Sequence, residues 1–176
     1  MLKLRELVEQ NKNHKIYCDM DGVLTDFDRM FYETAGITSE EFRKKHPDDA
    51  PNDVLLWETI DKQGGLNFWS HMYWTSDGKM LWEYIKNKNT EILSAPSKTI
   101  PEHSKLGKKL WCGRFLGKTV PLNLVRASEK QMFAKPHHIL IDDMEKNIER
   151  WKKAGGIGIL HKSAADTISE LKSMGL

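Results

Sequence analysis

The pattern of apolar and polar positions along the chain predicts an α/β fold. Short apolar runs rich in β-forming residues predict strands at 14–18, 91–93, 120–125, 138–141 and 156–160. Amphipathic stretches that follow several of these runs predict helices at 102–111, from after Asp143 through Trp151, and at 163–174. Strands that alternate with helices in this way form a parallel sheet with right-handed crossover connections.

Residues 27–88 depart from this alternation because their pattern is mostly helical. Thr38 followed by Glu41 predicts a capping box at the start of one helix. Asn52 and Asp77 are candidate caps at the starts of two further helices. A short amphipathic helix is also predicted at the N-terminus, with apolar positions at Leu2, Leu4, Leu7 and Val8.

Composition and charge narrow the class of protein. The 176 residues are 30% charged and 39% apolar, which is typical of one soluble α/β domain with a small insertion. A net charge of +2 gives no electrostatic basis for a dedicated binder of duplex nucleic acid or membranes. No apolar stretch reaches the ~18 residues needed to cross a bilayer, and no signal-peptide core is present. The two cysteines, Cys18 and Cys112, form no C-x-x-C pair, so we expect a reducing, cytoplasmic location.

Acidic side chains directly follow two of the predicted strands. Asp19 and Asp21 come after the first strand, and Asp142 and Asp143 follow the strand at 138–141. Because the carboxyl ends of parallel strands meet at one edge of a sheet, we expect these groups to lie together there, with Ser94. Carboxylates packed so closely are costly without a cation, and Mg²⁺ is the natural partner of carboxylates, water and phosphate.

Such a site suits the hydrolysis of a phosphate ester. One carboxylate attacks phosphorus and forms an acyl-phosphate, while a second protonates the leaving oxygen and then activates water. A metal ion, a lysine, a hydroxyl and turn N–H groups stabilise the charge on the phosphoryl oxygens. The D-M-D-G segment at 19–22 would alone also suit an ordinary turn or a calcium-binding loop, but the acidic pair downstream favours the catalytic interpretation.

These motifs resemble those of the haloacid dehalogenase superfamily of phosphatases. The likeness rests on DMDGVLTD at 19–26, ILS ending at Ser94, and ILIDD ending at Asp143. The resemblance implies a Rossmann-like three-layer sandwich with a parallel sheet and a small helical cap inserted after the first strand. It assigns residues 1–26 and 89–176 to the core domain and residues 27–88 to the cap.

The resemblance also implies roles for individual residues. Asp19 would be the nucleophile and Asp21 the general acid and base of a Mg²⁺-dependent phosphatase. The metal-binding set would be Asp19, Met20 (through its backbone carbonyl), Asp21, Asp142 and Asp143. The phosphate-binding set would be Ser94, Ala95 and Lys130. For the lysine of this set, Lys118 and Lys135 are the alternatives to Lys130.

Two further segments resemble the deoxyribonucleotidase branch of the superfamily, GGLNFW at 64–69 and SAPSK at 94–98. The resemblance implies a small-molecule nucleotide substrate, with Phe68 and Trp69 stacked on the base; these aromatic residues would otherwise belong to the cap's own core. Lys98 would contact the sugar or a second phosphate, or else be a solvated surface residue. A homodimer is an arrangement that the resemblance allows.

Three functions remain open at this stage. The first is a phosphatase for nucleoside monophosphates, and the second is a phosphatase for a nucleic-acid end or another small phosphorylated metabolite. The third is a non-catalytic binding protein that retains the fold. Two side interpretations accompany them: Asp26 is either a helix cap or a site residue, and His137 with His138 is structural.

Overall fold

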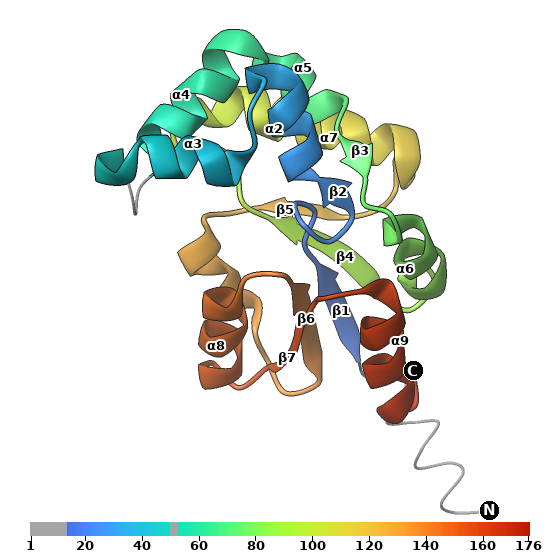
Figure 1. The fold of residues 1–176 in the computed structure, drawn as a ribbon. Helices are drawn as coiled ribbons and strands as arrows, with labels where there is room; N and C mark the ends of the chain where they lie inside the picture. The colour runs from blue at the N-terminus through green and yellow to red at the C-terminus, as the bar shows by residue number, and fades with distance from the viewer. Residues whose placement is uncertain (1–13, 50–52) are drawn as a thin grey trace, which may run out of the picture.

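A parallel five-stranded sheet forms the centre of the structure, a computed structural model that describes residues 14–49 and 53–176 (Figure 1). Its strands, in spatial order, are β5 (Leu122–Leu124), β4 (Thr90–Ser94), β1 (Lys15–Cys18), β6 (His138–Asp142) and β7 (Ile157–Leu160). Each neighbouring pair runs parallel, which confirms the predicted α/β class. The predicted N-terminal amphipathic helix and the cap at Asn52 lie outside the described residues.

Apolar residues on both faces of the strands explain why the sheet is covered on both sides. Ile16 and Cys18 pack into one buried cluster, whereas Tyr17 between them packs into another, as the two-residue period of a strand requires. One face carries α8 (Glu145–Lys153) and the 3₁₀ segment η2 (Ala127–Phe133). The other face carries α6 (Gly78–Ile85), α7 (Pro101–Phe115) and α9 (Ala164–Ser173). The result is a three-layer sandwich (Figure 1).

A helical insertion follows β1, as the sequence predicts. Two short antiparallel strands, β2 (Thr25–Asp26) and β3 (Tyr73–Trp74), connect it to the core. Between them lie α2 (Phe27–Ala35), α3 (Ser39–Lys45), η1 (Pro47–Asp49), α4 (Val54–Gln63) and α5 (Gly65–Ser70). The predicted Thr38–Glu41 capping box is present at the start of α3. Asp26 caps α2 by accepting a hydrogen bond from the Arg29 N–H at 3.0 Å.

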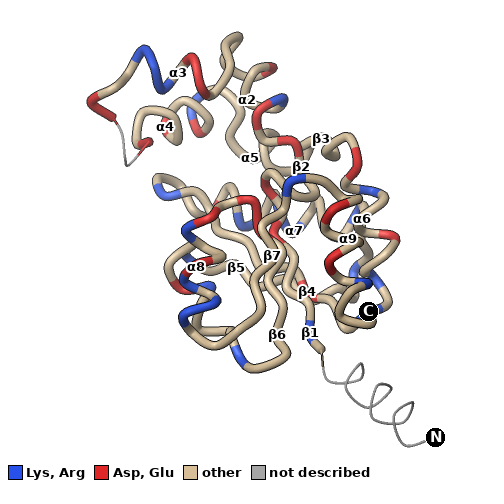
Figure 2. The backbone as a smooth tube through the Cα atoms, turned by 60° about the horizontal axis from the view of Figure 1, so that its bottom comes forward, with Lys and Arg blue, Asp and Glu red and all other residues tan. Residues whose placement is uncertain are grey.

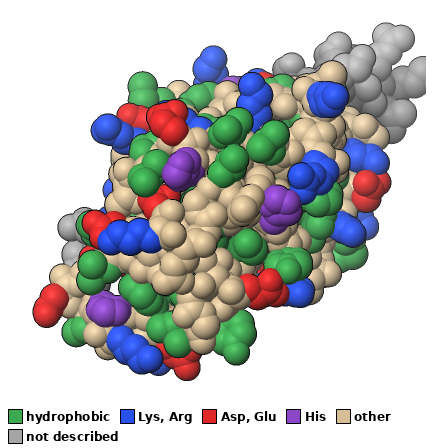
Figure 3. All heavy atoms as spheres, turned by 90° about the horizontal axis from the view of Figure 1, so that it is seen from above, with side chains coloured by type: hydrophobic (Ala, Val, Ile, Leu, Met, Phe, Trp, Pro, Cys, Tyr) green, Lys and Arg blue, Asp and Glu red, His purple; other side chains and the backbone are tan. Residues whose placement is uncertain are grey.

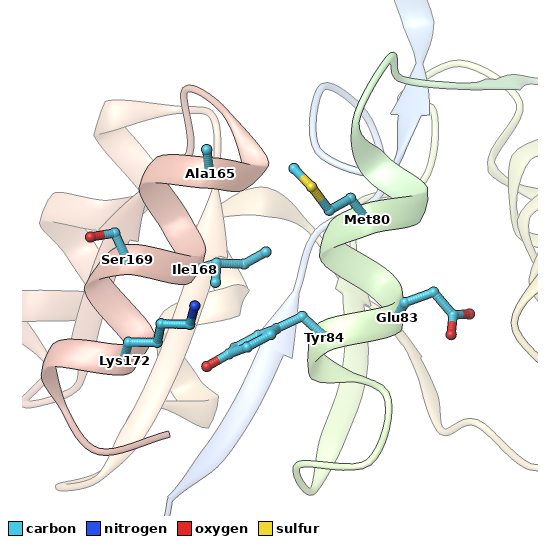
Figure 4. Close-up of a pocket in the computed structure, with 7 residues that line it drawn as sticks. All are labelled: Met80, Glu83, Tyr84, Ala165, Ile168, Ser169 and Lys172. Carbon is cyan, nitrogen blue, oxygen red and sulfur yellow. The ribbon is translucent and has the colours of Figure 1, made fainter.

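Helix α6 lies with the core rather than with the other inserted helices, because it packs beside α9 on the sheet (Figures 1 and 4). Met80 and Tyr84 of α6 face Ile168 of α9 across a groove. Asp77 is the N-cap residue of α6, but its carboxylate accepts from the Ala164 N–H of α9 at 2.6 Å instead of capping its own helix. The division of the chain at residue 88 stays a prediction, and these contacts favour an earlier end of the cap.

The inserted helices dock onto the core mainly through α5 and α7. Gly107 of α7 makes this close approach possible, because a Cβ atom there would lie 2.3 Å from the Cβ of Trp69. The contact places the insertion over the carboxyl ends of the strands (Figure 1). None of the helices among the described residues combines the length and the hydrophobicity that a bilayer span requires.

Candidate active site

Three carboxylates meet at the carboxyl edge of the sheet. Asp19 follows β1, and Asp142 ends the adjacent strand β6, because Cys18 and Ile141 are partners in the parallel register. Asp143 comes next in the chain. One oxygen atom from each of the three lies within 4.8 Å of the others. The predicted convergence of Asp19, Asp142 and Asp143 is therefore present in the structure.

The turn after Asp19 shapes the acidic edge. The carbonyl oxygen of Met20 accepts hydrogen bonds from the N–H groups of Val23, Leu24 and Thr25 at 2.8–3.1 Å. This oxygen is thus committed to the turn, which corrects the expectation that Met20 contributes its carbonyl to a metal. The neighbouring carbonyl of Asp21 accepts from no N–H group among the described residues, and we infer that it is the better candidate for a backbone ligand.

Gly22 is required in this turn for two reasons. Its φ of 77° lies in the left-handed region, which favours glycine. In addition, a Cβ atom at this position would lie 2.2 Å from Oδ2 of Asp143. The side chain of Asp143 therefore occupies space that only a glycine leaves open.

We predict that Gly22→Ala raises the dissociation constant for Mg²⁺ by roughly tenfold or more, because displacing Asp143 weakens the acidic cluster. A calorimetric titration with Mg²⁺ gives this value. Gly36→Ala is the matched control, since Gly36 has a similar φ of 73° but no atom within 4 Å of an added Cβ. The control should lose stability without a change in its Mg²⁺ affinity, and equal dissociation constants for both variants would contradict the role assigned to Gly22.

Lys130 bridges the two buried carboxylates. Its ammonium lies 2.8 Å from Asp19 Oδ2 and 2.7 Å from Asp142 Oδ2, and the side chain is only 2% exposed. Lys118 and Lys135, the two alternatives, are exposed on the surface. Of the three candidates, the structure therefore brings only Lys130 to the acidic cluster.

The charges of the cluster shift the pKa values of its members in opposite directions. Burial opposes ionisation of Asp19, but Lys130 and Lys108 outweigh it and lower the pKa of this carboxyl. Burial and the Asp19 carboxylate raise the pKa of Asp142 against the opposing effect of Lys130. Burial, followed by the charges of Asp19 and Asp142, raises the pKa of Asp143 to about 7. The lysines therefore favour the ionised form of Asp19.

Asp142 is held in place by groups that sequence patterns did not identify. The side-chain amide of Asn147 donates to both carboxylate oxygens at 3.0 and 3.1 Å, and the Met144 N–H donates to Oδ1 at 2.9 Å. Asn147 lies in the first turn of α8, which begins at Glu145. Hydrogen bonds of this kind fix the direction in which a metal-binding carboxylate presents its remaining lone pairs.

Asp21 faces a second lysine that the sequence analysis missed. Lys108 of α7 is fully buried, and its ammonium lies 2.6 Å from Asp21 Oδ2. The same ammonium donates to Ser94 Oγ at 2.9 Å and to the Ala95 carbonyl at 2.8 Å. The Asp21 carboxylate is not part of the three-carboxylate cluster, so the metal-binding role expected of Asp21 stays a prediction. Ser94 and Ala95 do lie at the site, as predicted.

The predicted base-stacking residues are buried in the structure. Phe68 and Trp69 are both 0% exposed, and their rings pack against each other and against Phe27, with Trp57 stacked on Trp69. Helix α5 turns this pair toward α4 and α7, so neither ring offers a face to a base in this conformation. The alternative, an aromatic core of the cap, is the arrangement that the structure contains. Lys98 is exposed and lies in the loop that follows β4.

The residues present fit a divalent metal ion. The four carboxylates of Asp19, Asp21, Asp142 and Asp143 face the two ammonium groups of Lys108 and Lys130, which leaves two formal negative charges. Burial is the main cause of the raised pKa values of Asp142 and Asp143, and the neighbouring carboxylates add to it. A hard dication with oxygen ligands would neutralise the remaining negative charge, and Mg²⁺ is commonly held by one or two carboxylates together with water and phosphate.

Solved structures with the same fold come from the haloacid dehalogenase superfamily. A superfamily hydrolase of subfamily IA from Geobacter sulfurreducens aligns with a TM-score of 0.57, 13% identity and coverage of 91% of this chain and 97% of the other. A phosphatase of the superfamily from Thermococcus onnurineus aligns with a TM-score of 0.52 and 10% identity, over 90% of this chain and 97% of the other. The magnesium complex of an enzyme of the family from Bacteroides thetaiotaomicron, bt-2542, aligns with a TM-score of 0.50 and 14% identity, over 90% of this chain and 97% of the other.

The chain therefore has the fold of haloacid dehalogenase-type hydrolases, together with an acidic cluster at the edge of its sheet. The sequence itself matches no model of a known protein family and no curated protein. Dehalogenases also have this fold, so the choice of reaction depends on the residues of the site.

Proposed function

We propose that the protein is a Mg²⁺-dependent phosphomonoester hydrolase that forms an aspartyl-phosphate on Asp19 and acts on nucleoside monophosphates, deoxyribonucleotides included. The observation that best supports this proposal is that the carboxylates of Asp19 and Asp21 have different lysine partners. Asp19 belongs to the three-carboxylate cluster with Lys130, whereas Asp21 is turned toward Lys108. Two carboxyl groups in different environments suit the two roles of nucleophile and proton carrier.

Asp21 favours phosphate ester hydrolysis over dehalogenation. A halide leaves carbon as a stable anion, so its displacement needs no proton donor. An alkoxide that leaves phosphorus is strongly basic and needs one. Asp21 lies two residues after Asp19 and is held by Lys108 and Thr25, which places a carboxyl group beside the reacting centre for that purpose.

In the first step, an oxygen of Asp19 attacks phosphorus, and the bond from phosphorus to the ester oxygen breaks as Asp21 gives its proton to that oxygen. In the second step, Asp21 takes a proton from water, and the water oxygen attacks phosphorus so that the Asp19 carboxylate is released. Ser94 and Lys130 supply hydrogen-bond donors and positive charge near the phosphoryl oxygens. Mg²⁺ held by Asp19, Asp142, Asp143 and the Asp21 carbonyl would neutralise the charge of the phosphoryl group.

The nucleotide as substrate is supported by the resemblance of residues 64–69 and 94–98 to the deoxyribonucleotidase branch, and by the small helical insertion over the site. A long nucleic-acid substrate is less favoured. Basic and acidic residues both occur on the helices, and the face seen from above mixes hydrophobic, charged and histidine side chains (Figures 2 and 3). Neither view of the described residues contains a continuous basic stripe that would follow a phosphate backbone. A cytoplasmic location and a homodimer stay predictions.

A phosphate-release assay over several substrate classes tests this proposal. With Mg²⁺ present, kcat/KM for nucleoside monophosphates should exceed that for sugar phosphates and for a 5′-phosphorylated oligonucleotide by at least about tenfold. Equal activity on sugar phosphates would reject the nucleotide assignment and leave the chemistry standing. A purified, folded protein that released phosphate from none of these substrates would remove the phosphatase itself and favour a binding protein with this fold.

A further inference from the structure

Lys108 makes a set of contacts that uses its whole hydrogen-bonding capacity. An ammonium group has three N–H donors and no acceptor. Its three acceptors are Asp21 Oδ2 at 2.6 Å, the Ala95 carbonyl at 2.8 Å and Ser94 Oγ at 2.9 Å. No donor remains for an incoming phosphate unless one of these bonds breaks. This distinguishes Lys108 from Lys130, which contacts the nucleophile Asp19 directly.

Both carboxylate oxygens of Asp21 accept hydrogen bonds. Lys108 binds Oδ2, and the hydroxyl of Thr25 donates to Oδ1 at 3.1 Å. Thr25 is itself buried and forms part of β2, the strand that leads into the cap. Two partners on opposite oxygens fix the rotation of the carboxyl group, so that one orientation of Asp21 is favoured over the others.

Lys108 also orients Ser94. Because the lysine donates to Ser94 Oγ, the serine hydroxyl keeps its own hydrogen for another acceptor. A hydrogen bond from Ser94 is among the interactions that lower the pKa of Asp19. The single ammonium group of Lys108 therefore connects Asp21 with the hydroxyl group beside the nucleophile.

Packing holds Lys108 itself in place. The side chain is fully buried, and its ammonium lies 5.2 Å from the centre of the Trp69 ring of the cap. Gly107, the preceding residue, lets α5 approach closely enough for Trp69 to cover this position. A buried charge with three partners and an aromatic cover has little freedom to move.

We propose that Lys108 is a positioning residue that orients the proton carrier Asp21 and the hydroxyl of Ser94, rather than a ligand of the transferring phosphoryl group. This inference rests on the proposed phosphatase function and adds a specific consequence to it. The benefit of a well-oriented Asp21 depends on how much the leaving oxygen needs a proton. A basic alkoxide needs the proton while its bond to phosphorus breaks, whereas p-nitrophenolate leaves readily without one.

The test compares Lys108→Met on two substrates, a nucleoside monophosphate and p-nitrophenyl phosphate. We expect kcat/KM for the nucleotide to fall by roughly 10²–10³-fold, and kcat/KM for the aryl ester to fall by less than about tenfold. The ratio kcat/KM is the right quantity, because it reports only the steps up to formation of the aspartyl-phosphate. Asp21→Asn should give the same selective loss, since it removes the proton carrier that Lys108 orients.

Two controls and a second test variant separate the alternatives. Lys109→Met makes the same change at the next, exposed position of α7 and should leave both activities within about twofold. Lys130→Met should lower both activities together, because Lys130 contacts Asp19. If Lys108→Met does not fold, as judged by circular dichroism, Thr25→Val tests the same idea from the other oxygen of Asp21 and should show a smaller selective loss on the nucleotide.

Equal losses on the two substrates would overturn the proposal, since they would mean that Lys108 acts on the phosphoryl group and not on the leaving group. The same conclusion would follow if Thr25→Val lowered both activities equally. A wild-type protein that hydrolyses neither ester refutes the phosphatase assignment instead, so the two failures are distinguishable.

Discussion

Asp19→Asn is expected to abolish phosphate release, with a loss of at least about 10⁴-fold in kcat. The amide has nearly the same shape as the carboxylate, but it lacks the charge and the lone pairs needed to attack phosphorus. The surrounding turn should survive, because Asn can still accept the 2.8 Å hydrogen bond from the Met20 N–H through its carbonyl oxygen. Steady-state phosphate release measures the loss, and intact-mass analysis after acid quenching shows whether a phosphoryl group has been attached to the wild-type enzyme.

Asp26→Asn is the matched control for this variant. It makes the same substitution seven positions later in the same motif, DMDGVLTD. Asp26 caps α2, and asparagine is an equally good capping residue, so both activity and stability should change little. An Asp19→Asn protein that kept more than about 1% of wild-type activity would exclude Asp19 as the nucleophile.

Removal of Mg²⁺ should produce the second large effect, a complete and reversible loss of turnover in EDTA. The same treatment should change how stability depends on pH. In the metal-free protein the pKa of Asp143 is raised to about 7 from an ordinary value of 3.8, so the folded state holds this proton more tightly than the unfolded state. Stability therefore falls as the pH rises from about 4 to about 7, and the ionised cluster remains destabilising above that range.

Added Mg²⁺ should offset this loss, because it binds the ionised carboxylates of the folded protein. The midpoint of thermal unfolding should consequently rise more on Mg²⁺ addition at pH 8 than at pH 5. Asp143→Asn should flatten the pH dependence of the metal-free protein, since it removes the group that titrates in this range. Full activity after exhaustive dialysis against EDTA, or a Mg²⁺ effect on stability that is the same at both pH values, would contradict the proposed metal site.

The local features of the fold could be predicted from the sequence because each depends on neighbouring residues. The capping box at Thr38 and the cap at Asp26 are formed by side chains that bond N–H groups three positions away. The strands that end before Asp19 and Asp143 are short apolar runs followed directly by carboxylates. Parallel pairing of β1 with β6 then places Asp19 and Asp142 at the same edge of the sheet, so no knowledge of helix packing is needed to predict their proximity.

Contacts that depend on how distant elements pack were not predictable in this way. Lys108 is one of 27 lysine and arginine residues, and no spacing rule separates it from its exposed neighbour Lys109. Only the docking of α7 under the cap carries its ammonium to Asp21, 87 positions earlier in the chain. Asn147 likewise reaches Asp142 only because α8 returns over the end of β6.

Two expectations were wrong for related reasons. Phe68 and Trp69 were expected to stack on a base, yet both rings are buried. Gly107 lets α7 approach Trp69 closely, and Phe68 packs against Phe27 and Trp69. Met20 was expected to offer its carbonyl to a metal, but the chain folds back within the turn, and three N–H groups occupy that oxygen.

The sequence by itself determined the α/β alternation, the carboxyl edge where Asp19, Ser94 and Asp142 meet, and the chemistry that such groups favour, because apolar periodicity and strand direction are local properties. The tertiary structure decided which of these carboxylates lie close together, which lysines face them, and which aromatic rings are buried. Those outcomes depend on helix packing and on burial, where a displacement of a few tenths of an ångström changes which polar groups are partners.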